Sequence, residues 1–231
     1  MVEIRLGSGH APAWSSDGER IAFYDNRDGD EEIFVMDADG RHVTQLTHND
    51  VDDGDPTWSP DDRQIAFTRF SIEGPDIYVM NADGAGEVNL TNTSPAFEQE
   101  PSWSSTGKIA FVRSVDLWTM NPDGSEQLRL TDTPSLADYG PDWSPDGREI
   151  AFTSQEFGGG IFTIRPDGSG LRHLPNTAEG DRFPTWGPLG AQIAFSSQTE
   201  AGEDIFRIDA DGEARIQLTD TLYSWKPDWR P

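Results

Sequence analysis

A Pro-x-Trp motif recurs at nearly even spacing from one end of the chain to the other. It occurs six times, and subtracting successive Trp numbers gives 44, 45, 40, 43 and 43 residues. Repeats with a period of ~40–50 residues are typical of stacked or radially arranged supersecondary units. A domain boundary would interrupt the period, so we expect one domain over residues 1–231. The motifs lie at Pro12–Trp14, Pro56–Trp58, Pro101–Trp103, Pro141–Trp143, Pro184–Trp186 and Pro227–Trp229.

Each repeat contains four short segments with strand patterns, separated by turn residues. Pro-x-Trp opens the first segment, and the second contains Ile-Ala-Phe in all five complete copies, as at 150–152. A third apolar segment, such as Ile161–Ile164, runs into Asp-Gly, which is a strong hairpin signal, and a fourth ends in a Leu. Four antiparallel strands per repeat of this length are typical of a β-propeller blade. We therefore predict an all-β propeller with five complete four-stranded blades.

The two ends of the chain leave the closure of the ring open. Val2–Leu6 alternates apolar and polar residues like an outer fourth strand, and Pro227–Trp229 has the pattern of an inner first strand. These pieces predict either five blades with extra terminal strands or six blade positions with an incomplete sixth blade. A ring completed by another chain is a further alternative, so self-association through the terminal strands stays open.

The repeat resembles the WD40-like PD40 repeats of the TolB family. The resemblance rests on Asp138–Phe152, followed by variants of Ile-Phe/Tyr-x-Met-Asn-x-Asp-Gly and Leu-Thr. It implies a propeller, and TolB-type propellers bind protein partners in the periplasm. Related repeats occur in tricorn-type proteases and in prolyl-oligopeptidase-like enzymes. The hydrolase domains of such enzymes, and the α/β domain of TolB, have no counterpart in this sequence.

Acidic residues dominate the composition. The chain has 42 Asp and Glu against 17 Lys and Arg, which gives a formal charge of −25. A surface of this sign repels nucleic acid phosphates and anionic lipid headgroups, so we expect a protein or basic peptide partner and no nucleic acid. No apolar run approaches the ~20 residues that span a bilayer, so no membrane insertion is expected. The lack of cysteine excludes disulfides and thiolate metal sites.

The compartment stays open. The family resemblance implies a periplasmic or secreted protein. Residues 1–7 are too short and too polar for a secretory signal, which favours the cytoplasm unless a signal has been removed.

Acidic residues recur just before the first strand of each repeat. If the loops that enter these strands converge at one end of the channel, the carboxylates form a cluster suited to Ca²⁺, Mg²⁺ or Na⁺. The alternative is that each acid caps its own turn or binds the backbone of the next blade. Both interpretations concern Asp53, Asp55, Glu98, Glu100, Asp138 and Asp181.

Aromatic residues outside the repeat pattern lie in the same entry loops. Mixed with the acids, they would form an amphipathic rim suited to a peptide that carries Lys or Arg. The alternative is that they close the channel mouth as hydrophobic lids. These residues are Phe97, Tyr139, Phe183, Tyr223 and Trp225.

Signals for catalysis are weak. The sequence contains no Gly-x-Ser-x-Gly elbow, no His-Glu-x-x-His and no phosphate-binding loop. None of the four histidines has a Ser or carboxylate partner that stands out from the repeat. We therefore predict a non-catalytic binding scaffold that holds a protein or peptide in the loops at one channel mouth. The competing interpretation is a hydrolase that acts on glycans or peptides with channel-mouth carboxylates.

Overall fold

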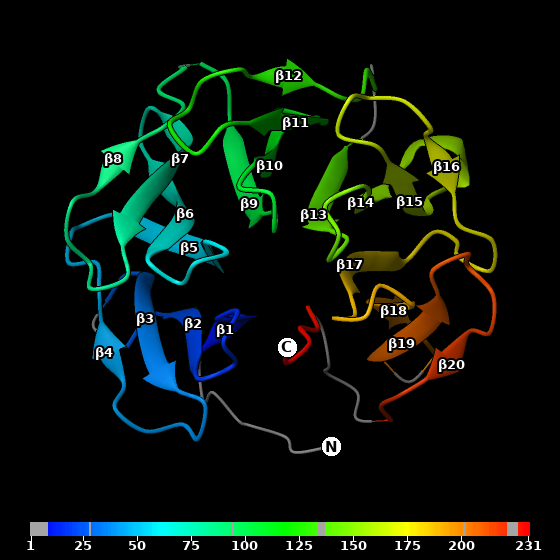
Figure 1. Cartoon of the computed structure of the whole chain (residues 1–231), viewed down its shortest axis with the longest axis horizontal. Coiled ribbons are helices and arrows are strands. Elements are labelled where there is room, and N and C mark those ends of the chain that lie inside the picture. The colour runs from blue at the N-terminus through cyan, green and yellow to red at the C-terminus, as the bar shows by residue number, and fades with distance from the viewer. Residues whose placement is uncertain (1–8, 28, 94, 134–136, 201, 221–225) are drawn as a thin grey trace.

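Five sheets surround a central channel (Figure 1). The computed structural model describes residues 9–27, 29–93, 95–133, 137–200, 202–220 and 226–231. Each sheet has four antiparallel strands in chain order, so the sequence-based prediction of an all-β propeller with five four-stranded blades is confirmed. We number the blades 1 to 5 along the chain, and within each blade the first strand faces the channel.

Every blade is built from three longer strands and a two-residue outer strand. The first strands are β1 (His10–Trp14), β5 (Asp52–Trp58), β9 (Glu98–Trp103), β13 (Asp138–Trp143) and β17 (Asp181–Trp186). The second strands are β2 (Arg20–Asp25), β6 (Gln64–Ser71), β10 (Ile109–Arg113), β14 (Ile150–Ser154) and β18 (Gln192–Gln198). The third strands are β3 (Glu32–Asp37), β7 (Gly74–Asn81), β11 (Asp116–Met120), β15 (Gly160–Ile164) and β19 (Glu203–Asp209). The outer strands are β4 (Thr44–Gln45), β8 (Val88–Asn89), β12 (Leu128–Arg129), β16 (Arg172–His173) and β20 (Ile216–Gln217).

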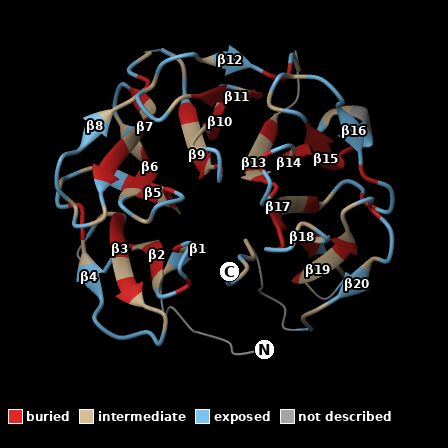
Figure 2. Cartoon of the chain, viewed as in Figure 1, coloured by how far each residue is buried: buried red, intermediate tan, exposed pale blue. Residues whose placement is uncertain are grey.

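The core lies between neighbouring blades. In the interface of blades 1 and 2, Ala22 and Ile33 pack against Trp58, Ile65 and Phe67. The small Ala side chain lets the indole of the next blade approach, and the same arrangement recurs around the ring. Figure 2 shows the result: buried residues concentrate on the second and third strands, and the short outer strands are largely exposed.

The Gly of the Asp-Gly turn recurs at the same place in each repeat for two reasons, its backbone conformation and its close approach to the preceding blade. Gly84 has φ of +87°, which favours Gly, and a Cβ there would lie 2.8 Å from the carbonyl oxygen of Leu46 in the preceding blade. Gly124 stands in the same relation to Leu90, at 2.6 Å. The turn of one blade therefore touches the outer strand region of the blade before it.

Of the two terminal strands predicted from the sequence, one is untested and the other is not observed. Val2–Leu6 lies outside the described residues. Pro227–Trp229 is in no strand, because it has no ladder partner among the described residues, although it reaches the channel. The structure's helical content within the described residues is one turn of 3₁₀-helix, η1 (Glu156–Gly158), and no helix there is long and apolar enough to cross a membrane.

We expect Trp143→Ala to lower the free energy of unfolding by ~3–5 kcal/mol, because it removes a large buried ring. Trp143 is 6% exposed, and its Nε1 donates to the carbonyl oxygen of Ser102 in the preceding blade at 3.1 Å. Urea unfolding followed by circular dichroism measures the change. Leu189→Ala is the matched control: Leu189 is 92% exposed, so its loss should cost less than ~0.5 kcal/mol. Equal stability of the two variants would show that the indole does not hold the blades together.

Candidate functional site

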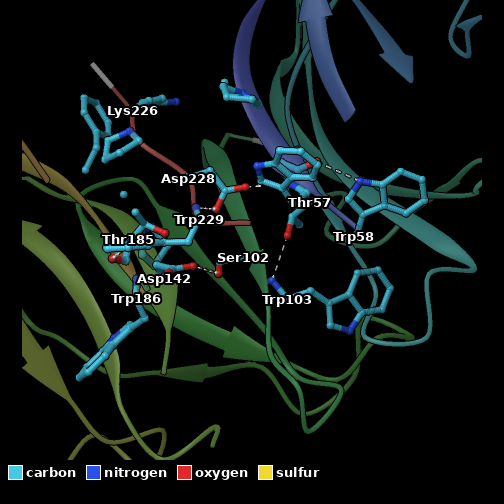
Figure 3. Close-up of a pocket in the computed structure, with 18 of the residues that line it drawn as sticks. Thr57, Trp58, Ser102, Trp103, Asp142, Thr185, Trp186, Lys226, Asp228 and Trp229 are labelled. Carbon is cyan, nitrogen blue, oxygen red and sulfur yellow. Dashed lines mark hydrogen bonds between the residues drawn. The ribbon is translucent and has the colours of Figure 1, made fainter. Parts of the chain in front are cut away.

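The first strands enclose a cavity of about 450 Å³ at the centre of the ring. Its wall consists of the six Pro-x-Trp motifs and their neighbours, so all five blades contribute, together with the segment 226–231, which we call the closing segment. Figure 3 shows side chains from these motifs around the cavity, including Asp142, Asp228 and Lys226. The sequence motif that defines the repeat therefore also builds the channel.

A β-bulge occurs in the first strand of each blade where the residue directly before Pro has positive φ. The pairing register shifts around this position in all five blades, as between Gly54 and Thr57. Bulges re-aim side chains, and positive φ is uncommon outside Gly. We call the six residues before the prolines the mouth ring: Ala11 (43°), Asp55 (49°), Glu100 (57°), Gly140 (62°), Phe183 (53°) and Lys226 (49°).

The bulge separates the two groups of acids that the sequence placed in one cluster. Asp53, Glu98, Asp138 and Asp181 already belong to the first strands, not to entry loops, and they are 0–3% exposed. Of the six predicted acids, only Asp55 and Glu100, which lie within the register shift, line the channel. The expected convergence of six carboxylates at one mouth is therefore wrong for four of them.

Arginines of the same blade bind three of these four buried acids. Arg69 donates to Asp53 at 2.7 and 2.8 Å. Arg113 donates to Glu98 at 2.6 Å, and Arg215 to Asp181 at 2.9 Å. The fourth acid, Asp138, accepts from the hydroxyl of Thr133 at 3.5 Å instead. The described residues contain no group of three or more His, Asp or Glu placed to hold a metal ion.

The mouth ring combines acids, an amine and an aromatic ring. Lys226 Nζ lies 2.6 Å from Asp55 Oδ1 and 5.0 Å from the centre of the Phe183 ring. Their side chains are 20% (Lys226) and 17% (Asp55) exposed, so the ion pair is mostly shielded from water. Burial lowers the pKa of Lys226, but the carboxylates of Asp55 and Glu100 outweigh it and raise that pKa. The side chain of Lys226 therefore carries its positive charge at the mouth.

Glu100 has a structural contact as well as a place in the mouth. The backbone N–H groups of Glu100 and Phe183 donate to hydroxyls of the preceding blade, Thr68 and Thr153, at 3.1 and 3.0 Å. Val112 stands in the corresponding position of blade 3, and the N–H of Gly140 donates instead to Glu100 Oε2 at 2.6 Å. Burial raises the pKa of Glu100, and Lys226 opposes the shift.

Two further acids that line the channel, Asp142 and Asp228, occupy the variable place of Pro-x-Trp. Asp142 Oδ2 accepts from the backbone N–H of Trp186 in the next blade at 2.7 Å. Asp228 Oδ2 accepts from that of Trp14 at 2.8 Å. Desolvation by burial raises the pKa of both carboxyls to about 7. Asp228 is the more exposed of the two, so channel water screens its charge, and the effect on stability depends mainly on Asp142.

Two of the five predicted rim aromatics contact each other in the structure. Tyr139 and Phe183 meet edge to face with ring centres 5.4 Å apart, and Phe183 lines the channel. Phe97 is 54% exposed and does not line the cavity. Tyr223 and Trp225 lie outside the described residues.

The sequence interpretation overlooked Lys226, Asp142 and Asp228 as site residues. Their place in the repeat could have revealed them: Lys226 comes directly before the proline of the last Pro-x-Trp motif, and the two acids are the middle residue of such a motif. Two histidines have contacts of their own outside the channel: His42 Nδ1 lies 2.5 Å from Asp37 Oδ2, and the His173 ring packs on Phe162 at 4.8 Å.

We expect Asp142→Asn to flatten the dependence of stability on pH. The pKa of Asp142 is about 7 in the folded chain and ~4 in an unfolded chain, so only the folded state keeps the proton between these values. Stability then decreases as the pH rises from ~4 to ~7, and Asn, which cannot ionise, removes this decrease. The two values differ by ~4 kcal/mol in free energy, and contact with channel water reduces our expectation to ~1–2 kcal/mol.

Urea unfolding at about pH 4.5 and about pH 8 measures this difference. The control is Asp39→Asn on an outer turn, whose side chain is 58% exposed, and it should keep the slope of the unaltered chain. An unchanged slope in Asp142→Asn would contradict the burial argument. The amide oxygen of Asn can still accept from Trp186, so loss of the hydrogen bond would not explain the result.

The comparisons with known proteins concern the repeat and the fold. Residues 2–116 match the family model of the PD40 repeat, described as the TolB beta propeller domain. No curated protein sequence matches the chain. A structure assigned to TolB from Agrobacterium tumefaciens superposes with a TM-score of 0.82 at 24% identity, covering 96% of this chain and 86% of that one.

Two other solved structures show how widely the fold is used. TolB from Acinetobacter baumannii has a TM-score of 0.77 at 20% identity, and the match covers 88% of this chain but 53% of that one. An oligogalacturonate lyase in complex with manganese has a TM-score of 0.67 at 17% identity, covering 90% of this chain and 64% of that one. At these identities the likeness shows the fold alone. Together with its repeat motif and its five blades, the family match identifies the chain as a TolB-like β-propeller built of PD40 repeats.

Proposed function

We propose that this propeller is a non-catalytic scaffold that binds a protein or peptide at the mouth ring, with a Lys or Arg of the partner as the anchor. The observation that carries the proposal is the position of Lys226, which lies between a carboxylate and an aromatic face. This arrangement supplies both a charge-assisted hydrogen bond and a cation–π contact. The contacts of the chain's own lysine thus support a basic side chain as the group that the mouth binds.

The charge of the whole chain favours the same class of partner. A formal charge of −25 attracts basic segments from a distance and repels polyanions. Asp55, Glu100 and Phe183 project from a rigid strand framework, so little conformational entropy is lost when a partner binds. Tyr139, which packs on Phe183, extends the aromatic surface. TolB proteins share the fold, which adds protein binding by analogy.

A second candidate function is catalysis by Asp142, because a carboxyl with a pKa near 7 has the properties of a general acid or base. Its surroundings oppose this role. Asp142 Oδ2 is bound to the N–H of Trp186, and Oδ1 lies 3.5 Å from the hydroxyl of Ser102. An anionic oligogalacturonate, the substrate named for one structural neighbour, would also meet a strongly negative protein.

Selection from a phage-displayed library of short peptides tests the binding proposal. We expect enriched peptides to carry Lys or Arg, and their affinity, measured by fluorescence anisotropy, to fall about fivefold in Asp55→Asn, as for a partly exposed ion pair worth ~1 kcal/mol. Phe183→Leu should weaken binding by a similar factor through loss of the cation–π contact.

Asp39→Asn, which removes an exposed acid from an outer turn, is the control for net charge, and it should leave the affinity unchanged. Enriched peptides without basic residues, or equal losses in Asp55→Asn and Asp39→Asn, would refute the anchor. Turnover of glycan or peptide substrates that disappears in Asp142→Asn would establish the enzyme instead.

A further inference from the structure

The closing segment occupies a sixth place in the ring of channel-lining motifs. Its Pro227–Trp229 lies between blade 5 and blade 1, near the C-terminal end marked at the centre of Figure 1. Lys226 has φ of +49°, the value found for Asp55 in blade 2. The segment therefore has the backbone form of a first strand without a blade of its own among the described residues.

Blade 5 receives the closing segment through contacts that also occur between other neighbouring blades. The N–H of Lys226 donates to Ser196 Oγ at 3.0 Å, as the N–H of Phe183 does to Thr153. Trp229 Nε1 donates to the carbonyl oxygen of Thr185 at 3.2 Å, which repeats the contact of Trp143 with Ser102. These contacts form one wall of a slot.

Blade 1 forms the other wall. Asp228 accepts from the N–H of Trp14 at 2.8 Å. The Arg230 guanidinium lies 5.3 Å from the Trp14 ring centre, and its Nη2 donates to the carbonyl oxygen of Gly18 at 3.2 Å. Lys226 reaches past blade 1 to Asp55 of blade 2. The blades therefore bind four side chains of the segment: the amine of Lys226 and the acid, indole and guanidinium of residues 228 to 230.

Gly187 shapes the slot for the indole. The residue after the motif Trp is Ser in blades 1 to 4 and Gly in blade 5. A Cβ on Gly187 would lie 3.6 Å from the indole of Trp229, and Gly187 does not have positive φ, so the backbone itself does not require Gly. A Cβ there would be in ordinary van der Waals contact with the indole and 3.3 Å from the carbonyl oxygen of Gln192, so only a side chain that extends beyond Cβ would overlap the place of Trp229.

We propose that this slot is a peptide-binding site for a Lys-Pro-Asp-Trp-Arg segment, filled in one chain by residues 226–231 and able to accept the same segment from a second copy. The first strands of blades 1 to 5 are held by ladders to their second strands. Residues 226–231 lie in no strand, and the contacts described above reach across to blades 1, 2 and 5. Such a segment can leave its place without breaking a ladder between described strands.

The test measures binding of a fluorescent peptide, Lys-Pro-Asp-Trp-Arg-Pro, by anisotropy. In the unaltered chain the tethered segment competes at high effective concentration, so binding should be weak. In full-length Trp229→Ala the competitor is impaired, and we expect the peptide to bind at least tenfold more tightly. If Trp229→Ala is unfolded by circular dichroism, Lys226→Ala replaces it, because that change weakens the segment by removing the ion pair with Asp55 and the contact with Phe183 while it keeps the indole.

Two controls make the result specific to the slot. The same peptide carrying Trp229→Ala should bind at least tenfold less tightly than the intact peptide. Gly187→Leu, added to the weakened chain, should abolish binding because its side chain fills the place of the indole. Equal affinity of the peptide for the unaltered and weakened chains, or binding that survives Gly187→Leu, would overturn the proposal. Both controls change only the contact with the indole, so their outcome is distinguishable from that of Asp55→Asn, which tests the basic anchor.

Discussion

The contact between neighbouring blades is the interaction on which the whole structure depends. A four-stranded sheet alone leaves its apolar faces in water, and here each sheet is covered by the next through residues such as Ala22 and Trp58. The indole of Trp58 also needs a hydrogen-bond acceptor, which the preceding blade provides as the carbonyl oxygen of Ala13. Such an arrangement is stable only if the last interface is also covered. The closing segment, with Trp229 on blade 5 and Asp228 on blade 1, provides part of that cover.

The same contacts separate the framework from the chemistry of the channel. Conserving the motif Pro and Trp around the ring maintains the blade interfaces, whereas the residue between them and the residue before them vary. Asp142 shows that the two roles can meet in one side chain, since it lines the cavity and binds the next blade. In Asp55, by contrast, the two roles are separate: the carboxylate binds Lys226 at the mouth, and the backbone forms the bulge. Positions that vary independently on a common scaffold are consistent with the binding role proposed above.

The sequence predicted the blades because the repeat period and turn signals are local properties that five copies reinforce. The sequence failed to predict where the acids three positions before the prolines lie, because their position and partners depend on the pairing register. Asp53 meets Arg69, sixteen positions along the chain, only because β5 and β6 pair antiparallel with a bulge between Gly54 and Thr57. Asp181 meets Arg215, which lies near the outer edge of the blade. No spacing rule applied to one repeat reveals these partners, whereas the importance of Lys226 required knowing that the last motif enters the same ring.

The uniform backbone of the mouth ring has a consequence for how such a protein can diversify. Six positions share φ values between 43° and 62°, yet they carry six different residue types, from Ala and Gly to Phe and Lys. The same backbone form therefore carries side chains as different as those of Asp55, Phe183 and Lys226, and a substitution at such a position alters the mouth while the bulge remains. Two positions are restricted. A Cβ on Gly140 would lie 3.0 Å from the ring of Phe183, and the carboxylate of Glu100 substitutes for a missing hydroxyl and binds Gly140. The mouth ring is therefore a set of variable positions on one backbone form, and at Glu100 the variable side chain is also part of a blade interface.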